Sequence, residues 1–277
     1  MPDPYFLRVT VYATFHSQFY LMRAFLTPGL LLLLTLTTTA TSLAGEVSVA
    51  VAANFTEAAR KIADAFEQSR EHHTRLSIGS TGQLYTQITN GAPFEVFLAA
   101  DAARPEKAEQ DGYAMSGSRF TYARGALVLW SPKPDLFDDG EAWLHRGKYG
   151  RIAIANPKTA PYGLAAQQVL QKLGLWDRLG SELARGNSIA QTFQFVATGN
   201  ADAGFIALSQ VIANEAAGNG DAGSVWNIPA DDYAPIEQQA VLLLKGVNNP
   251  VACAFIAFMK SAAAREIISG YGYTLPR

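Results

Sequence analysis

Short apolar segments alternate with helical patterns along most of this chain, and this alternation constrains the fold more than any other feature. Three segments of strand length in the first half are each followed by the start of a helix, at 47–52, 75–79 and 94–99. The alternation restarts with segments at 126–130, 152–155, 204–207 and 239–244. This order is typical of a mostly parallel sheet with helices on both faces, so we predict an α/β protein.

The restart near residue 126 favours two lobes over one large domain. The 233 residues after position 44 would form lobes of about 115 residues each, within the usual size of a domain. We expect residues 45–124 and 235–277 to form the first lobe and residues 125–234 the second. The chain would then cross between the lobes twice.

Residues 1–44 are predicted to be a signal peptide with an N-terminal extension. Arg23 precedes an apolar run at 24–34, and small residues follow as far as Ala44, which is the order of a secretory signal. The run contains Pro28 and is shorter than the roughly 20 residues that a membrane-spanning helix needs, so we favour cleavage over an anchor. The mature protein is therefore expected in the periplasm.

The charges of the expected mature chain exclude several classes of partner. Residues 45–277 contain 20 Lys+Arg and 23 Asp+Glu, with no basic block suited to nucleic acid or anionic lipid. A bound anion would therefore have to be captured locally. We expect no cofactor and a monomer. The single cysteine, Cys253, lies in an apolar run and is interpreted as a buried structural thiol.

The most informative motif is a helix start after an expected strand, and it occurs four times. Three starts have the spacing of a capping box, and a fourth has proline in its first turn: Asn54 to Glu57, Ser80 to Gln83, Ser188 to Gln191, and Ala160 to Gly163. In open α/β sheets, ligands bind beyond the carboxyl ends of the strands, where these starts would lie. None of the four motifs contains Arg, Lys or His.

Uncharged helix starts of this kind can bind an anion. Free N–H groups at a helix N-terminus bind anions, and each helix end carries roughly half a positive charge. Four ends, two from each half of the chain, would present about two positive charges, comparable to a dianion. The sequence thus predicts capture of an ionised oxyanion by hydrogen bonds rather than salt bridges. Ordinary helix capping is the alternative for each motif alone.

Five segments spread over the expected mature chain carry a resemblance to a known family: 51–55, 78–88, 90–101, 156–163 and 270–276. Together they resemble the periplasmic molybdate-binding proteins of molybdate ABC transporters. The resemblance implies the type II periplasmic-binding-protein fold, with two α/β lobes around a ligand cleft. It also implies capture of molybdate, with tungstate bound as well, and delivery to a transmembrane permease.

The resemblance further implies which residues bind the oxyanion. Molybdenum is bound only as part of that ion, through the same residues. They belong to the four helix starts and supply hydroxyls or amides: Asn54, Ser80, Thr81, Tyr162 and Ile189. Some family members have a ligand tyrosine where this chain has Ala207. The hydroxyl of Tyr162 is a candidate replacement for it.

Other functions stay open from the sequence. Helix starts do not identify the central atom of the oxyanion, so sulfate is an alternative ligand; phosphate is less favoured because a protonated oxyanion would need an acceptor. A hydrolase using Ser80 or Thr81 is an alternative from another class, although no base is matched to either residue. Ser80 also lacks the Gly-x-Ser-x-Gly pattern of a nucleophile elbow. We therefore expect a binding protein rather than an enzyme.

Overall fold

The computed structural model describes residues 45–70, 72–180, 182–219 and 223–276. The chain divides into two units, Met1–Leu43 and Ala44–Arg277, and the described residues belong to the second. The predicted signal peptide lies outside the described residues. Within them, none of the helices combines the length and the apolar character needed to cross a membrane.

Within the described residues, ten strands form two five-stranded sheets. The first sheet contains β1 (Glu46–Ala52), β2 (His73–Gly79), β3 (Val96–Ala99), β4 (Phe120–Gly125) and β10 (Ile236–Leu242). The second contains β5 (Leu127–Ser131), β6 (Ile152–Ala155), β7 (Leu183–Gly186), β8 (Ala203–Ala207) and β9 (Ser224–Asn227). Their orders are β2-β1-β3-β10-β4 and β7-β6-β8-β5-β9. Each sheet with its helices is called a lobe below.

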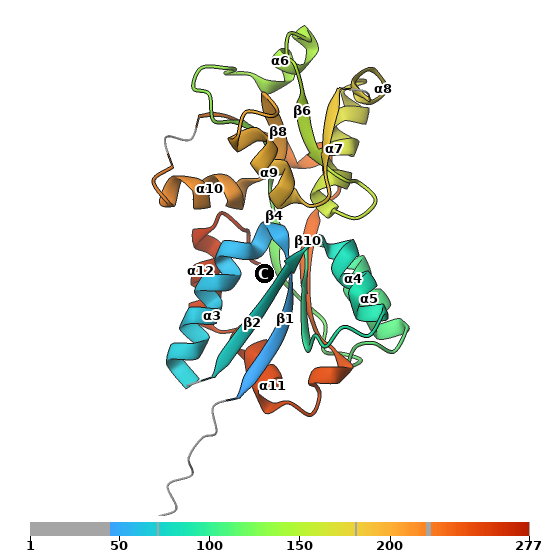
Figure 1. Ribbon diagram of the computed structural model, residues 1–277, viewed down its shortest axis with the longest axis vertical. Coiled ribbons are helices and arrows are strands. Elements are labelled where there is room, and N and C mark those ends of the chain that lie inside the picture. Colours follow the sequence, from blue (N-terminus) through green and yellow to red (C-terminus); the bar gives the residue numbers. More distant parts are fainter. Residues whose placement is uncertain (1–44, 71, 181, 220–222, 277) are drawn as a thin grey trace, which may run out of the picture. The chain divides into compact units, whose positions relative to one another are not determined.

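Helices flank both sheets, as Figure 1 shows. The first lobe has η1 (Ala53–Phe55), α3 (Thr56–Arg70), α4 (Thr81–Thr89), α5 (Ala103–Gln110), η3 (Leu244–Gly246), α11 (Pro250–Phe258) and α12 (Ala262–Gly270). The second has α6 (Gly140–Arg146), α7 (Pro161–Lys172), α8 (Trp176–Leu179), α9 (Ile189–Ala197), α10 (Leu208–Ala216) and η2 (Ala230–Asp232). The predicted two-lobed α/β fold is confirmed.

Strand β1 shows why the first sheet is covered on both faces. Successive side chains of a strand point to opposite faces. Val47, Val49 and Val51 belong to the apolar cluster that includes α3, α11 and α12. Ala50 belongs to a second cluster, which includes residues of α4 and α5. Because both faces are buried, residues 49–52 form a continuous apolar run and the strand needs helices on each side.

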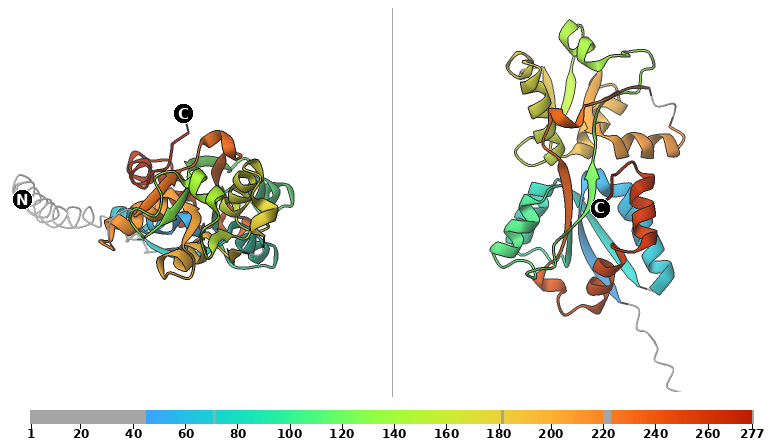
Figure 2. Two further views of the ribbon diagram at one scale, coloured as in Figure 1. Left: turned by 90° about the horizontal axis from the view of Figure 1, so that it is seen from above. Right: turned by 180° about the vertical axis from the view of Figure 1, so that it is seen from behind.

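The chain crosses between the two sheets twice. It leaves β4 at Gly125 and enters β5 at Leu127, and it returns between β9 and β10. Strands β4 and β10 are antiparallel neighbours, and Figure 2 shows them side by side in the view from behind. Strands β1, β2 and β3 are parallel to one another, as are β6, β7 and β8. The crossing segments therefore add antiparallel strands to two parallel cores.

The prediction of a buried Cys253 is wrong, because the side chain is exposed. It lies on α11, which buries Val251, Ala252 and Phe255 against the first sheet. With 3.6 residues per turn, a helix buries only one face, and Cys253 falls on the opposite one. An apolar run in a helix was thus read as uniformly buried.

Leu129→Ala should test how strongly the second lobe depends on its central apolar layer. Leu129 is fully buried on β5, opposite Phe205 of β8 and Trp226 of β9. Removing its side chain should lower the free energy of unfolding by about 2 to 5 kcal/mol, because the site is enclosed on both sides. Urea denaturation of the ligand-free protein measures this change.

Leu164→Ala is the matched control, because Leu164 is 46% exposed on α7. Its free energy of unfolding should stay within about 0.5 kcal/mol of the parent. Equal losses for both variants would contradict the assignment of Leu129 to the core.

Candidate functional site

A small cavity lies where strand ends and helix starts of both lobes meet. Its volume is about 10 Å³, and its lining comes from residues that end or follow β1, β2, β3, β6 and β7. The lining residues are Ala52, Ala53, Asn54, Ser80, Thr81, Ala100, Ala160, Pro161, Tyr162 and Ile189. Sites for organic ligands usually measure about 300 to 1,000 Å³. At this volume the cavity has room for about one water molecule, so the lobes would have to part slightly to admit even a compact polyatomic ligand.

All five residues predicted to bind the ligand line this one cavity: Asn54, Ser80, Thr81, Tyr162 and Ile189. They come from four segments that are far apart in the sequence, two in each lobe. The structure thus brings the predicted residues together, and their role in binding stays a prediction. Ala207 is fully buried and is not among the lining residues.

Two of the helix starts are capped by serine as predicted from the sequence. Ser80 has extended backbone before α4, and its Oγ accepts from Gln83 N at 3.4 Å. Ser188 has extended backbone before α9, and its Oγ accepts from Gln191 N at 3.3 Å. Helix α7 begins with Pro161 in place of a side-chain cap. Each arrangement leaves the first-turn N–H groups pointing out of the helix end.

Asn54 differs from the predicted N-cap. It lies inside the short η1, whose preceding residue is Ala52, and the side chain makes no capping bond. Its Nδ2 instead donates to Gln238 Oε1 at 2.9 Å and to Tyr273 Oη at 3.0 Å. Both amide hydrogens are therefore used by protein acceptors, which leaves the backbone N–H as the donor of Asn54 that has no acceptor among the described residues.

Backbone N–H groups supply most of the donors at the cavity. Among the described residues, no protein acceptor pairs with the N–H of Thr81, Tyr162 or Ile189, each in the first turn of its helix. Asn54, in the single turn of η1, is the fourth such residue. These groups lack partners because a helix offers none to its first turn.

Two buried hydroxyls add to these donors. Thr81 Oγ1 accepts from Ala100 N at 3.0 Å, and Ser80 Oγ accepts from the α4 backbone. A hydroxyl has one hydrogen to donate besides its acceptor lone pairs. Neither hydroxyl donates to a protein acceptor among the described residues, so each keeps its own hydrogen for a ligand.

The cavity lining contains no Asp, Glu, His, Lys or Arg. Beyond the lining, Arg104 pairs with Asp101, so the positive charge of Arg104 is compensated. The described residues also contain no group of three or more His, Cys, Asp or Glu that could hold a metal ion. The cavity therefore offers neutral donors rather than charge.

Hydrogen bonds between the lobes surround the cavity. Gly82 N at the start of α4 donates to Thr159 O at 2.9 Å, and Arg104 Nη2 donates to Lys158 O at 3.2 Å. A Cβ on residue 82 would lie 3.0 Å from the Thr159 backbone, so glycine permits this approach. The lobes are therefore in direct contact beside the predicted site.

The hydroxyl of Tyr162 is the predicted replacement for the tyrosine that some family members have at position 207, and this role stays a prediction. The hydroxyl accepts from Gln238 Nε2 at 3.2 Å. A Cβ on Gly125 would lie 2.0 Å from the same oxygen, so the phenol occupies the point where the chain crosses between lobes. Sequence reasoning missed Gln238, because it lies between Glu237 and Gln239 in the polar half of β10 and its residue type alone does not set it apart.

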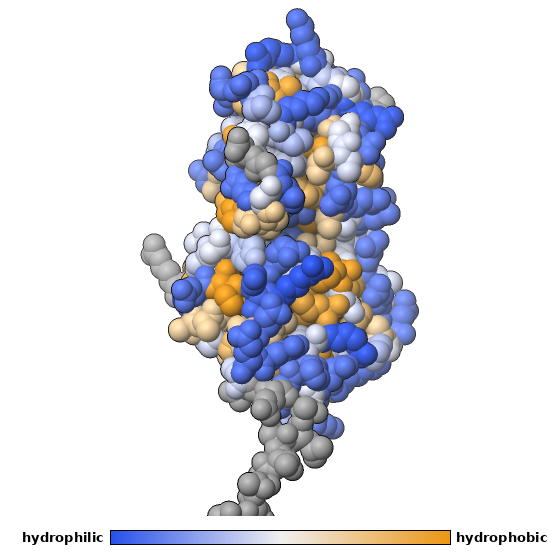
Figure 3. Space-filling model, turned by 60° about the vertical axis from the view of Figure 1, so that its left-hand side comes forward, coloured by the Kyte–Doolittle hydropathy of each residue, from blue (hydrophilic) through white to orange (hydrophobic). Residues whose placement is uncertain are grey.

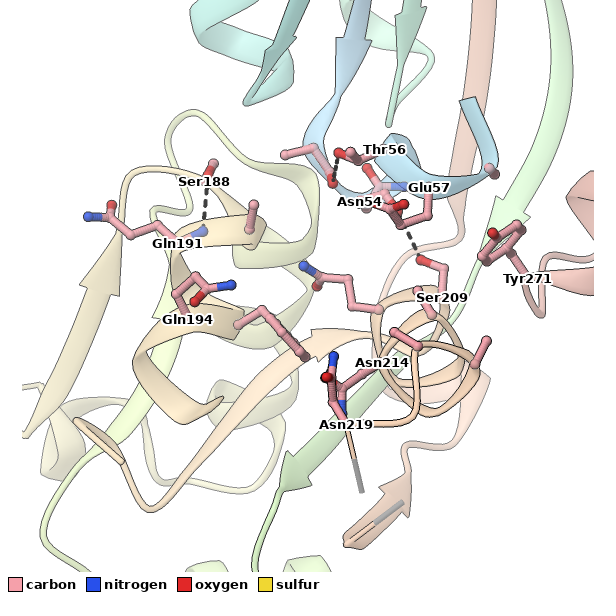
Figure 4. A pocket seen from close by; sticks show the side chains of 18 of the residues that line it. Asn54, Thr56, Glu57, Ser188, Gln191, Gln194, Ser209, Asn214, Asn219 and Tyr271 are labelled. Carbon is pink, nitrogen blue, oxygen red and sulfur yellow. Dashed lines mark hydrogen bonds between the residues drawn. The ribbon is translucent and has the colours of Figure 1, made fainter. Parts of the chain in front are cut away.

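A larger groove of about 920 Å³ lies next to the cavity and shares Ala53 and Asn54 with it. It runs between η1 and α3 of the first lobe and α9 and α10 of the second, and Figure 4 shows its many amide side chains. Figure 3 turns this side forward and shows a mostly hydrophilic surface with hydrophobic patches around its middle. Of the predicted ligand residues, only Asn54 lines the groove. The small cavity is therefore the candidate site.

Comparison with known proteins places this architecture in a family. Residues 47–274 match the family described as bacterial extracellular solute-binding protein. The molybdate-binding protein ModA of Azotobacter vinelandii is 55% identical over 232 residues, which cover 84% of this chain and 91% of that protein. ModA of Rhodobacter capsulatus is 52% identical over 230 residues, covering 83% and 88%. This chain belongs to the bacterial extracellular solute-binding proteins.

Solved structures agree with this assignment. The periplasmic molybdate-binding protein of Azotobacter vinelandii superposes with a TM-score of 0.79 at 43% identity, covering 83% of this chain and all of that one. The sulfate-binding protein SubI of Mycobacterium tuberculosis has a TM-score of 0.70 at 14% identity, a likeness of fold alone. The predicted resemblance to the molybdate-binding proteins is confirmed, and these relatives are binding proteins rather than enzymes.

Three buried tyrosines surround the crossing point behind the cavity. Burial, before any other cause, raises the pKa of Tyr122, Tyr162 and Tyr273 well above the ordinary value for tyrosine. Their phenols therefore stay protonated in the folded protein at pH values where the phenols of the unfolded chain ionise. Each such group stabilises the fold below the unfolded pKa of about 10 and loses this effect as pH rises through its folded pKa.

The free energy of unfolding should therefore fall between about pH 10 and 11 more steeply in the parent than in Tyr273→Phe, which has one buried phenol fewer. Urea denaturation at a series of pH values gives both slopes. Leu164→Ala is the control, since it removes a side chain that is 46% exposed and carries no proton, and it should leave the slope of the parent unchanged. Identical slopes for all three proteins would contradict the burial of a protonated Tyr273.

Proposed function

We propose that the protein binds molybdate in the periplasm and delivers it to the permease of an ABC transporter. One observation carries the ligand class. N–H groups from four helix starts and two free hydroxyl hydrogens surround one cavity whose lining has no charged side chain. Such a site suits a compact anion that accepts hydrogen bonds on all sides.

The protonation state of the anion supports this ligand. Molybdate near neutral pH is a tetrahedral dianion whose oxygens only accept hydrogen bonds. Phosphate near neutral pH carries a proton and would need an acceptor, whereas no carboxylate lines the cavity. Donors come from both lobes, so one ion would contact the first lobe through Asn54 and Thr81 and the second through Tyr162 and Ile189.

Relatives favour molybdate over sulfate as the ligand. The proteins of Azotobacter vinelandii and Rhodobacter capsulatus are described as molybdate-binding and share more than half of their aligned residues with this chain. The sulfate-binding neighbour shares 14%. Tungstate is proposed as a second ligand because its size and charge are close to those of molybdate. The proposed secretion rests on the signal-like order of residues 1–44.

The purified mature chain should bind molybdate and tungstate with one-to-one stoichiometry and sulfate far more weakly. Sulfate has shorter bonds from its central atom to its oxygens, so it should fit the donors of both lobes less well and lose some of these charge-assisted bonds, each worth about 1.5 to 3 kcal/mol. Isothermal titration calorimetry with molybdate, tungstate, sulfate and phosphate provides the measurement. Equal affinity for sulfate would contradict the choice of molybdate and leave an oxyanion-binding protein.

Ile189→Pro should weaken molybdate binding without preventing folding. Ile189 is the first residue of α9, where proline is tolerated, and Ser188 before it has the extended backbone that proline requires. The substitution removes an N–H that the helix does not use. Its loss should cost about 1.5 to 3 kcal/mol, or about 10- to 150-fold in affinity, as measured by calorimetry.

Ile189→Ala is the control, because it keeps the N–H and shortens only the buried side chain. Its affinity should stay near that of the parent, and the thermal midpoints of both ligand-free variants report whether the fold is intact. If the two variants bind equally well, the N–H of Ile189 is not a ligand.

A further inference from the structure

Gln238 connects the two lobes from a position outside the cavity lining. Its side chain is fully buried on β10 of the first lobe. The Oε1 atom accepts from Asn54 Nδ2 at 2.9 Å and from Tyr122 Oη at 3.0 Å. The Nε2 atom donates to Tyr162 Oη of the second lobe at 3.2 Å. One carboxamide thus contacts a candidate ligand residue from each lobe.

An irregularity in the first sheet orients this side chain. Opposite β4, Gln238 faces Ala123 and Gln239 faces Thr121, so Tyr122 has no opposite residue on β10. Such a bulge changes the direction of side chains and is common beside functional sites. The hydroxyl of the extra residue, Tyr122, reaches both Gln238 and the carbonyl of Ala99.

Asn54 is held on several sides by the same network. Its carbonyl lies 2.8 Å from Tyr273 Oη, and it accepts from Ser209 Oγ of α10 in the second lobe at 3.0 Å. Its carboxamide donates to Gln238 and Tyr273. The direction of the Asn54 N–H at the cavity therefore depends on groups of both lobes.

We propose that Gln238 is a positioning residue that fixes the Asn54 turn and joins it to Tyr162, so that bound molybdate is released slowly. This inference rests on the proposed function. The bond from Gln238 to Tyr162 joins the lobes in the arrangement in which they touch, so its loss destabilises that arrangement. A ligand that contacts both lobes leaves when they separate, and loss of this bond therefore speeds release.

The test compares Gln238→Met with Gln239→Met in the full mature chain. Both glutamines are buried on β10, with exposures of 0% and 7%. Gln239 bonds only within the first lobe, accepting from Arg119 at 2.9 Å and donating to Thr121 at 3.1 Å. Methionine keeps the approximate length of glutamine and removes its hydrogen bonds in either case. Both variants therefore lose a buried amide, but only Gln238→Met loses the hydrogen bond to the other lobe.

Release is measured with labelled molybdate bound to the protein and chased by excess unlabelled molybdate. Gln238→Met should release it about 10- to 100-fold faster than the parent, because buried partners in both lobes lose their bonds. Association should change by less than about threefold. The release rate of Gln239→Met should stay within about twofold of the parent's rate, even if the thermal midpoint of its ligand-free form falls as far as that of Gln238→Met.

Tyr162→Phe provides a second variant that keeps the ring and the backbone N–H. It removes only the hydroxyl that accepts from Gln238. Release should again be faster, and the double variant with Gln238→Met should release no faster than Gln238→Met alone, since both changes break the same link. If Gln238→Met does not fold, the release rate of Tyr162→Phe alone decides, and a rate equal to the parent's overturns the proposal.

Parent-like release from Gln238→Met, or equal acceleration by Gln239→Met, would overturn the positioning role. The positioning role would also be overturned if the double variant released molybdate faster by the product of the two single effects. Failure of the parent to bind molybdate would instead overturn the proposed function, and this inference with it. Molybdate binding by the parent therefore distinguishes failure of the proposed function from failure of the positioning role.

Discussion

Unpaired N–H groups at helix starts are the constraint on which the rest of this structure depends. A helix cannot satisfy its own first-turn N–H groups, so they must meet water, a side chain or a ligand. Parallel strands end at one edge of a sheet, and the helices that follow begin there. Two sheets whose edges face one another therefore bring Asn54 and Thr81 of one lobe to Tyr162 and Ile189 of the other.

Neutral donors give such a cavity a selectivity that charged side chains would not. An arginine in the lining would attract any anion, protonated or not, and its charge would be costly to bury when no ligand is bound. Backbone N–H groups are fixed in direction by the fold and cost little to keep unpaired near water. The neighbouring Arg104 is paired with Asp101, which limits its pull on an anion.

The sequence predicted the inner strands and missed three at the sheet edges: β4, β7 and β9. Inner strands such as β6 are apolar on both faces, whereas edge strand β7 alternates little and is partly exposed. The helix starts were found because capping residues act locally, as at Ser80. Gln238 was missed because its contacts depend on a bulge and on a residue 184 positions away in sequence, Asn54.

The link from Gln238 to Tyr162 is polar, and it stands beside apolar contacts that Ala52, Ala53 and Ala100 of the first lobe make with the core of the second. An apolar contact at this place would favour closure by about 25 cal/mol for each Å² buried, with or without ligand. Moving a two-state equilibrium from almost open to almost closed takes about 5.5 kcal/mol. The hydrogen bond from Gln238 to Tyr162 contributes about 0.5 to 1.5 kcal/mol. A bond of this size is too weak to keep the lobes together by itself, so it contributes to the geometry of their contact more than to its stability.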